Sequence, residues 1–234
     1  MLILALDTSS KAASCALWRE GVLLGESFLN CGLTHSQTIM PMVQGLLCAA
    51  SVSLDEVDRY AVSVGPGSFT GLRIGLSAVK GMAMAADKPC APVSTLEALA
   101  WNLCAFRGII APVMDARRAQ VYTALFQSDG ALPRRLREDA ALPIPALGRR
   151  LQDLGDTPVM LVGDGAAMCQ EALGGASARL LIAPEPLRHQ RAGSVAAVAA
   201  HTGAAVGAAQ LEPAYLRLPQ AQRELIEKKG GTTV

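Results

Sequence analysis

The sequence predicts an α/β protein made of two domains that share one order of strands and helices. Two repeated patterns carry this prediction. Asp7 ends an apolar run and is followed after eight residues by Ala-Leu-Trp, while Asp115 is followed after eight residues by Ala-Leu-Phe. An apolar run leading into Val-Gly-x-Gly occurs at 61–67 and again at 159–165. The chain has 234 residues, of which 51% are hydrophobic and 18% charged, enough for two small domains with buried cores.

The first half reads as three strands, a helix, a strand and a helix. The run LILALD at 2–7 is continuously apolar and ends in an acid, which is typical of a central buried strand. A hairpin follows, with strands at 12–19 and 22–29 around a Glu-Gly turn. Helices are expected at 34–50 and 70–86, with the strand of the 61–67 pattern between them. A further helix begins after Ser94, a good N-cap with Glu97 at the third helical position.

The second half repeats this order. Its first strand ends at Asp115, a hairpin follows, and a helical segment at roughly 145–154 precedes the strand of the second Val-Gly-x-Gly pattern. The boundary is expected near 104–108, which gives domains 1–106 and 107–234. An Ala-rich stretch predicts a helix over 191–209 that packs back on the first domain. This stretch is too weakly apolar to predict a membrane span.

Composition narrows the classes of function. The 21 basic and 20 acidic residues leave no basic excess of the kind that marks nucleic-acid binding. The six cysteines form no CxxC pair and no zinc-like spacing with histidine, which favours buried thiols in a reducing compartment. Asp7 comes too early for a signal peptide, so we expect a cytoplasmic protein. Local arginine clusters are interpreted as solvated faces or as weak tRNA contacts; they are Arg134, Arg135, Arg137, Arg149 and Arg150.

Two turns carry residues that suit phosphate or cation binding. Asp7 is followed by Thr8 and Ser9, so it could hold a hydrated cation or simply form the turn after its strand. The stretch Gly65-Pro66-Gly67-Ser68 lies between a strand and a helix, where glycines allow close approach and the helix N-terminus favours anions. It matches neither a P-loop nor a dinucleotide fingerprint.

Other catalytic signatures are missing from the sequence. The histidines are His35, His189 and His201, and they form no HxxxH or HExxH pair. No GxSxG nucleophile elbow occurs. We therefore expect no metal and no cofactor, and His35 is interpreted as a helix cap or surface group.

The helices at 34–50 and 70–86 carry more apolar surface than one sheet face requires. In the first, Met40 and Met42 lie off the main apolar stripe. In the second, Gly75 and Gly81 accept a helix-destabilising cost of about 1 kcal/mol each, and small residues allow another backbone to approach closely. Two interpretations remain open: close packing on the protein's own sheet, or an exposed patch for a protein partner.

Five stretches resemble a known family. The doubled βββαβα plan resembles the superfamily of actin-like ATPases, sugar kinases and chaperone ATPases. Within it, four stretches in the same order are similar to the TsaB family, also called YeaZ: ILALDTSSKAASCAL, HSQTIMPMVQGLL, VSVGPGSFTGLRIGLSAVKGMAMAADKPCAPVSTLEALA and MDARRAQVYTALF. EPAYLRLPQ is similar to the family's C-terminal signature. The region 131–190 matches only in outline.

The resemblance implies a non-catalytic scaffold or activator subunit of the bacterial machinery that makes threonylcarbamoyladenosine at adenosine 37 of certain tRNAs. In that family the paralogue TsaD carries the metal and the active site, through paired histidines. Here His35 stands alone and Ile39 occupies the fourth position after it. The implied partners are a TsaD-like catalytic paralogue and a TsaE-like ATPase, with tRNA contacted only indirectly or weakly, and a homodimer when the protein is alone.

The resemblance also implies a contact surface on the helices at 34–50 and 70–86. The expected partner-binding residues are His35, Ile39, Met40, Met42, Val43, Leu46, Gly71, Arg73, Gly75, Ala78, Gly81 and Met82. The candidate vestigial nucleotide-binding residues are Asp7, Thr8, Ser9, Gly65, Gly67 and Ser68.

Three alternatives to the subunit hypothesis remain at this point. The superfamily plan supports a nucleotide hydrolase or small-molecule kinase that uses Asp7 and the turn at 65–68. A glycoprotease is a variant of that idea, which the missing histidine pair disfavours. The arginine clusters support a tRNA-binding module.

Overall fold

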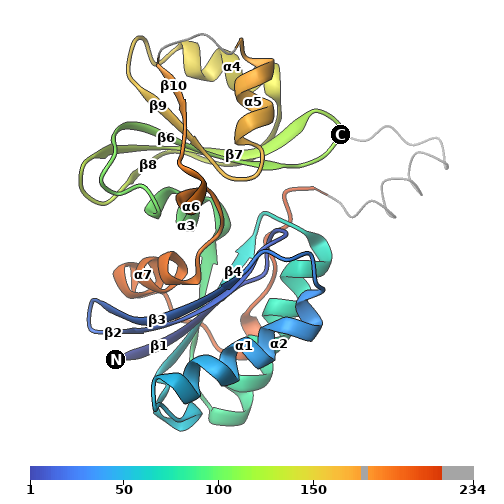
Figure 1. Cartoon of the computed structure of the whole chain (residues 1–234), viewed down its shortest axis with the longest axis vertical. Helices are drawn as coiled ribbons and strands as arrows, with labels where there is room; N and C mark the ends of the chain where they lie inside the picture. The colour runs from blue at the N-terminus through green and yellow to red at the C-terminus, as the bar shows by residue number, and fades with distance from the viewer. Residues whose placement is uncertain (175–178, 218–234) are drawn as a thin grey trace, which may run out of the picture.

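The protein folds into two α/β domains joined end to end (Figure 1). The computed structural model describes residues 1–174 and 179–217. The last residues assigned to the second domain, and the end of the EPAYLRLPQ stretch, lie outside this part of the chain. Each domain contains one five-stranded mixed sheet, so the predicted duplicated βββαβα plan is confirmed.

The first sheet has the strand order β3-β2-β1-β4-β5. The central strand β1 (Leu2–Asp7) pairs antiparallel with β2 (Ala13–Arg19) and parallel with β4 (Arg59–Gly65). At the two edges lie β3 (Val22–Leu29) and β5 (Cys90–Ser94), and β5 is a strand that the βββαβα pattern did not include. A short bridge from Val206 to Cys90 covers the outer side of β5.

Alternation along β1 divides the first domain into layers, because successive side chains of a strand point to opposite faces. Leu2, Leu4 and Leu6 pack under α1 (His35–Ala49) and α2 (Phe69–Ala86), whose predicted ranges differ by one residue at most. Ile3 and Ala5 pack against α7 (Ala192–Thr202) on the other face. Figure 1 shows α1 and α2 together on the outer face of this sheet.

The helix α7 is shorter than the predicted 191–209. It ends at Gly203, which adopts φ +65° as a left-handed C-cap. Its start is tied to β3, because Glu26 pairs with the Arg191 guanidinium and accepts a 2.9 Å hydrogen bond from the Gly193 amide. Residues far apart in sequence therefore complete the first domain.

The second sheet has the order β10-β9-β6-β7-β8. Its central strand β6 (Arg107–Asp115) forms an antiparallel pair with β7 (Gln120–Asp129), which pairs with β8 (Arg134–Pro143). On the other side of β6 lie β9 (Val159–Val162) and β10 (Leu180–Ile182), both parallel to it in direction. The helices α4 (Ile144–Gln152) and α5 (Ala166–Ala172) pack on one face.

The helix α3 (Thr95–Trp101) joins the domains. Ser94 caps it as predicted, with its hydroxyl oxygen 3.2 Å from the Glu97 amide. The Glu97 carboxylate instead binds Arg135 of β8 at 3.0 Å, so this arginine of the predicted basic cluster is engaged inside the protein. The apolar side of α3 packs on the second sheet, against residues such as Ile110 and Phe126. Short segments complete the fold: α6 (Glu185–Arg188) and the 3₁₀ turns Leu54–Glu56 and Ala208–Gln210.

Candidate functional site

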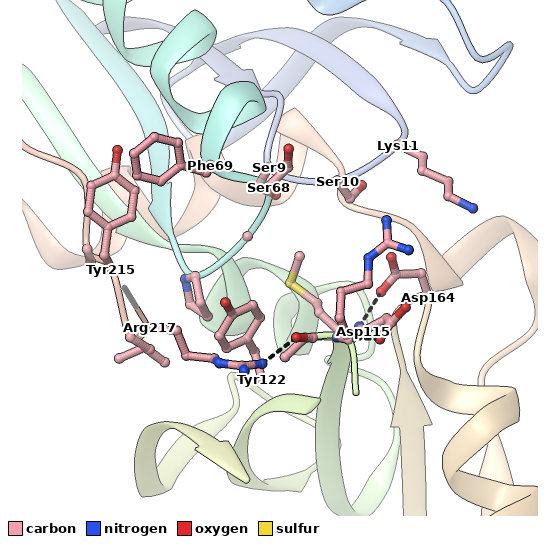
Figure 2. A pocket seen from close by; sticks show the side chains of 17 residues that line it. Ser9, Ser10, Lys11, Ser68, Phe69, Asp115, Tyr122, Asp164, Tyr215 and Arg217 are labelled. Carbon is pink, nitrogen blue, oxygen red and sulfur yellow. Dashed lines mark hydrogen bonds between the residues drawn. The ribbon is translucent and has the colours of Figure 1, made fainter. Parts of the chain in front are cut away.

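A cleft of about 410 Å³ lies between the two domains. The first domain supplies the β1–β2 loop, with Ser9, Ser10 and Lys11, and the turn before α2, with Ser68. The second domain supplies the β6–β7 loop, with Asp115, and the turn after β9. Figure 2 shows these loops facing each other across the cleft. The cleft thus collects the corresponding loops of both halves of the duplication.

A short segment near the described end of the chain crosses beside this cleft, and we call residues 214–217 the C-terminal strap. The Ala214 amide donates to the Val64 carbonyl oxygen at 2.8 Å, and the Tyr215 ring stacks on Phe69 with 4.7 Å between ring centroids. At its far end the Arg217 guanidinium donates to the carbonyl oxygen of Ala116 in the second domain (Figure 2). The strap therefore contacts both domains.

Asp7 lies beneath the cleft and does not line it. Its side chain is fully buried, and it accepts hydrogen bonds from the Ser9 amide at 2.9 Å, the Ser9 hydroxyl at 2.8 Å and the Ser63 hydroxyl. Burial raises the pKa of this carboxyl group, against the lowering effect of these hydrogen bonds. Asp7 therefore holds its own loop in place and is not exposed in the cleft. Its role as a cation ligand or a vestigial nucleotide-binding residue stays a prediction.

Thr8 and Gly65 are also absent from the cleft wall. The Thr8 hydroxyl donates to the Gly71 carbonyl oxygen at 2.8 Å. Gly65 has φ +136°, and a Cβ there would lie 2.4 Å from the Ala214 carbonyl oxygen of the strap. The strap therefore covers Gly65, so these two candidates for a vestigial nucleotide site serve packing.

The other predicted loop residues do lie at the cleft. Ser9, Gly67 and Ser68 line it, and the Ser68 amide donates to the Ser9 carbonyl oxygen at 2.7 Å. The Ser68 hydroxyl caps α2 by accepting from the Gly71 amide at 3.2 Å. A Cβ on Gly67 would lie 2.4 Å from the Ser9 carbonyl oxygen, so glycine permits the two loops to touch.

Asp115 and Asp164 line the cleft, although neither was among the site residues predicted from the sequence. The Asp115 amide donates to Asp164 Oδ1 at 3.1 Å, and the Arg117 amide donates to Asp115 Oδ1 at 2.7 Å. Removal of surrounding water raises the pKa of Asp164, and the neighbouring Asp115 carboxylate adds to that rise. The repeat could have revealed both, because Asp115 matches Asp7 and Asp164 stands where the first half has Pro66.

The predicted partner-binding residues divide into buried and exposed groups. Five of them face the protein's own interior, and they are Ile39, Met42, Val43, Gly71 and Met82, with Ile39 also reaching the groove described below. Gly75 is buried as well, because a Cβ there would lie 2.3 Å from Thr8 Oγ1. The expectation that Gly75 allows a partner helix to approach is therefore wrong: Gly75 allows α2 to approach the β1–β2 loop. A Cβ on Gly81 meets nothing within 4 Å.

The exposed Met40 and Arg73 and the half-buried Ala78 line an open groove between α1 and α2. Ile39, Phe69 and Ile74 complete its apolar walls. Leu46 is half-buried between α1 and β3. His35 turns toward the β1–β2 loop, where its Nε2 donates to the Ser10 carbonyl oxygen at 2.8 Å.

Over residues 1–174 and 179–217, no three His, Cys, Asp or Glu side chains gather in a way that could hold a metal ion. In the same part of the chain, no helix combines the length and the apolar character that crossing a membrane would need.

The duplicated sheets and the cleft between them define a two-domain protein of the actin-like ATPase fold. A family model described as "TsaD: tRNA N6-adenosine threonylcarbamoyltransferase" matches residues 31–225. The chain is 32% identical to the tRNA threonylcarbamoyladenosine biosynthesis protein TsaB of Bacillus subtilis over 229 residues, 98% of this chain and 100% of that protein. It is 41% identical to Escherichia coli TsaB over 132 residues, 55% of this chain and 56% of that protein.

The solved structures agree with the sequence comparison. YeaZ from Pseudomonas aeruginosa superimposes with a TM-score of 0.77 at 31% identity, covering 92% of this chain and 99% of that one. A second structure, described as an uncharacterized protein from the same organism with similarity to peptidase YEAZ, gives a TM-score of 0.78 at 30% identity. The chain belongs to the TsaB (YeaZ) family.

Proposed function

We propose that this protein acts in the biosynthesis of threonylcarbamoyladenosine in tRNA as a non-catalytic subunit. In this proposal it pairs with a TsaD-like catalytic paralogue and activates it, and a TsaE-like ATPase joins the pair. The protein contacts tRNA only indirectly or weakly and forms a homodimer when alone. The pathway follows from the names of the relatives in Bacillus subtilis and Escherichia coli.

The groove between α1 and α2 is the main observation that supports pairing with the catalytic paralogue. Met40 is 37% exposed, and it lines this groove together with the half-buried Phe69, Ile74 and Ala78. Exposed apolar surface costs free energy in water, about 25 cal/mol for each Å². An open groove with mainly apolar walls and an arginine among them resembles a protein–protein contact, where apolar side chains and Arg are enriched.

The local structure around His35 supports a subunit without its own metal chemistry. The family resemblance places paired histidines of the catalytic paralogue on the corresponding helix. Here the His35 ring bonds the protein's own Ser10 carbonyl oxygen, and Ile39, one turn later, is 1% exposed within the core. His35 is thus engaged within the protein, and isoleucine at position 39 offers no metal ligand.

A nucleotide hydrolase or small-molecule kinase remains the second candidate. The cleft supports it, because Ser10, Lys11 and the two acidic residues Asp115 and Asp164 line one cavity. The internal hydrogen bonds of Asp7 argue against its use as a catalytic acid. Calorimetry with ATP and Mg²⁺ decides: saturable heat at millimolar nucleotide supports this candidate, and its absence removes it.

The test of the proposal is light scattering after size exclusion, with this protein alone and mixed with the TsaD-like protein of its organism. We expect a one-to-one complex that replaces a homodimer. Met40→Glu and Ala78→Glu place a charge in the groove and should weaken the complex at least about 30-fold, as for central interface residues.

The matched control is Leu181→Glu, because Leu181 is 40% exposed on β10 of the second domain. It should leave the complex intact. A complex that tolerates both groove variants would contradict the assignment of the surface. No complex with the wild-type protein would contradict the pairing itself.

A further inference from the structure

The groove between α1 and α2, which we call the docking groove, is lined by one basic residue and by no acidic residue. Neither α1, with 15 residues, nor α2, with 18 residues, contains an aspartate or glutamate. Among the side chains that line the groove, Arg73 is the charged one. The opposite wall of the groove offers only apolar and hydroxyl groups, so the charge of Arg73 meets no acid within the groove.

The Arg73 guanidinium is held in place from two sides. Its Nε donates to the Tyr215 hydroxyl at 3.0 Å, and its central carbon lies 3.9 Å from the centroid of the Phe69 ring. Tyr215 itself stacks on Phe69 with an interplanar angle of 26°. Three side chains therefore form a compact stack at one end of the groove, and the C-terminal strap supplies one of them.

The rest of the guanidinium faces outward. Arg73 is exposed, and no hydrogen bond or ion pair joins its Nη groups to any residue in the described ranges 1–174 and 179–217. An arginine fork suits a carboxylate because two parallel N–H groups match its two oxygens. Fixing the fork beforehand reduces the rotamer freedom that is lost on binding.

We propose that Arg73 anchors a carboxylate of the docking partner, beside apolar partner side chains that fill the groove, and that Tyr215 is the positioning residue that sets the Arg73 fork. This inference rests on the proposed function and deepens it by naming the chemistry of the partner surface. The strap thereby connects the groove to the second domain, because Arg217 of the same segment binds the Ala116 carbonyl oxygen.

The lining of the groove favours a carboxylate on a protein partner over a phosphate group of tRNA as the ligand of Arg73. A phosphate bound at Arg73 would leave the apolar walls formed by Met40, Ile74 and Ala78 in water. A protein segment with a carboxylate next to apolar side chains satisfies both parts of the surface. The charge balance of the chain, 21 basic and 20 acidic residues, gives no wider basic field for nucleic acid.

The first experiment measures affinity for the TsaD-like protein as a function of salt. Arg73→Gln should weaken binding by about ten- to hundred-fold, the range of a charge-assisted contact, and should flatten the salt dependence. Arg73→Lys should recover part of this loss, since it keeps the charge without the fork. Tyr215→Phe keeps the stacked ring but removes the hydroxyl, and should weaken binding by several-fold.

Arg150→Gln serves as the control, because Arg150 is an exposed arginine on α4 of the second domain. It should leave both affinity and salt dependence unchanged. If Arg73→Gln binds like the wild type, the anchor is wrong while the proposed pairing stands. If Arg73→Gln reduces binding of tRNA but not of the protein partner, the anchor serves nucleic acid and our inference is overturned. No complex with wild-type protein would overturn both proposals.

The second experiment needs no partner. Nuclear magnetic resonance follows hydrogen exchange at the Arg73 Nε–H, which should be slow in the wild type because this group donates to Tyr215. Tyr215→Phe should speed this exchange without changing the cooperative unfolding transition. Unchanged exchange would show that Tyr215 does not position Arg73, whatever the binding data give.

Discussion

The two halves of this protein share one strand order but differ in their helices. In the first domain α1 and α2 have 15 and 18 residues, whereas their counterparts α4 and α5 have 9 and 7. An open groove with mainly apolar walls lies between the two longer helices. The shorter α4 instead exposes Arg149 and Arg150. The two copies of one duplicated frame thus differ in the surface that their helices present, and the proposed docking surface lies on the first copy.

The acidic residues that end the two central strands also differ. Asp7 is buried and receives hydrogen bonds from two serines, whereas Asp115 is exposed at the cleft. Position within the fold is therefore a poor guide to role. The surrounding side chains decide whether an acid holds a loop or faces the cleft.

Among the substitutions considered, one at Gly75 should lower the stability of the first domain most. A leucine there would drive its Cβ to 2.3 Å from Thr8 Oγ1 within a buried contact. We expect a loss of about 3 kcal/mol or more in the free energy of unfolding, because overpacked sites rarely relax. Urea denaturation followed by circular dichroism measures it.

Gly81→Leu is the matched control on the same helix. A Cβ there meets nothing within 4 Å, and replacing a helical glycine should change stability by at most about 1 kcal/mol in the favourable direction. Equal stability of the Gly75 and Gly81 variants would show that α2 does not pack on the β1–β2 loop as described.

Arg135 of β8 forms an ion pair with Glu97 of α3. Its removal therefore tests how much this contact between the two halves stabilises the protein. The half-buried guanidinium binds Glu97 of α3 at 3.0 Å and also Asp139, and it lies 4.6 Å from the Phe126 ring centroid. Arg135→Met should cost about 2 kcal/mol, since it leaves two carboxylates without this partner. Thermal and urea unfolding measure the cost.

The neighbouring Arg134 provides the comparison for Arg135. It is exposed and donates to Gln127 at 3.1 Å. Arg134→Met should change stability by less than about 0.5 kcal/mol, as most surface substitutions do. An equal effect of the two variants would mean that the Glu97 pair does not help to join the domains.

The smallest effect should be a pH dependence at Asp7. Because burial raises its folded-state pKa above the ordinary value of 3.8, the folded state binds more protons than the unfolded state as pH rises from that value. This carboxyl group therefore lowers the stability of the wild type as pH increases through that window. Asp7→Asn lacks this titration, so its stability relative to wild type should rise with pH.

Urea unfolding of both proteins between pH 4 and 7 tests this sign. Asp164→Asn should behave in the same direction, because loss of surrounding water raises the pKa of that carboxyl group as well. A wild type that gains stability over Asp7→Asn as pH rises would show that hydrogen bonds from Ser9 and Ser63 outweigh burial.

Sequence patterns predicted the frame of the protein because periodicity and capping are local. The continuous apolar run at β1 and the Ser94 cap both appear where expected. The edge strands β5 and β10 were missed, since five- and three-residue strands give little alternation to detect. The end of α7 was missed because alanines continue past Gly203, whose left-handed conformation ends the helix.

The site was predictable only in part, because burial depends on contacts distant in sequence. Glycine at position 75 suggested a close approach, but the sequence could not show that Thr8, more than sixty residues earlier, makes it. Ser63 and Ser9 enclose Asp7 for the same reason. The stacking of Tyr215 on Phe69 joins positions that no local pattern relates.

The most direct test of the account is hydrogen exchange of the backbone amides, with and without the TsaD-like protein. The protein is kept at a concentration at which it is monomeric alone, so that a homodimer does not mask the surface. We predict slower exchange over α1 and α2, at 35–49 and 69–86, and no change over α4 and α5. Protection over α4 and α5 with none over the first pair would contradict a docking surface carried by the first domain alone.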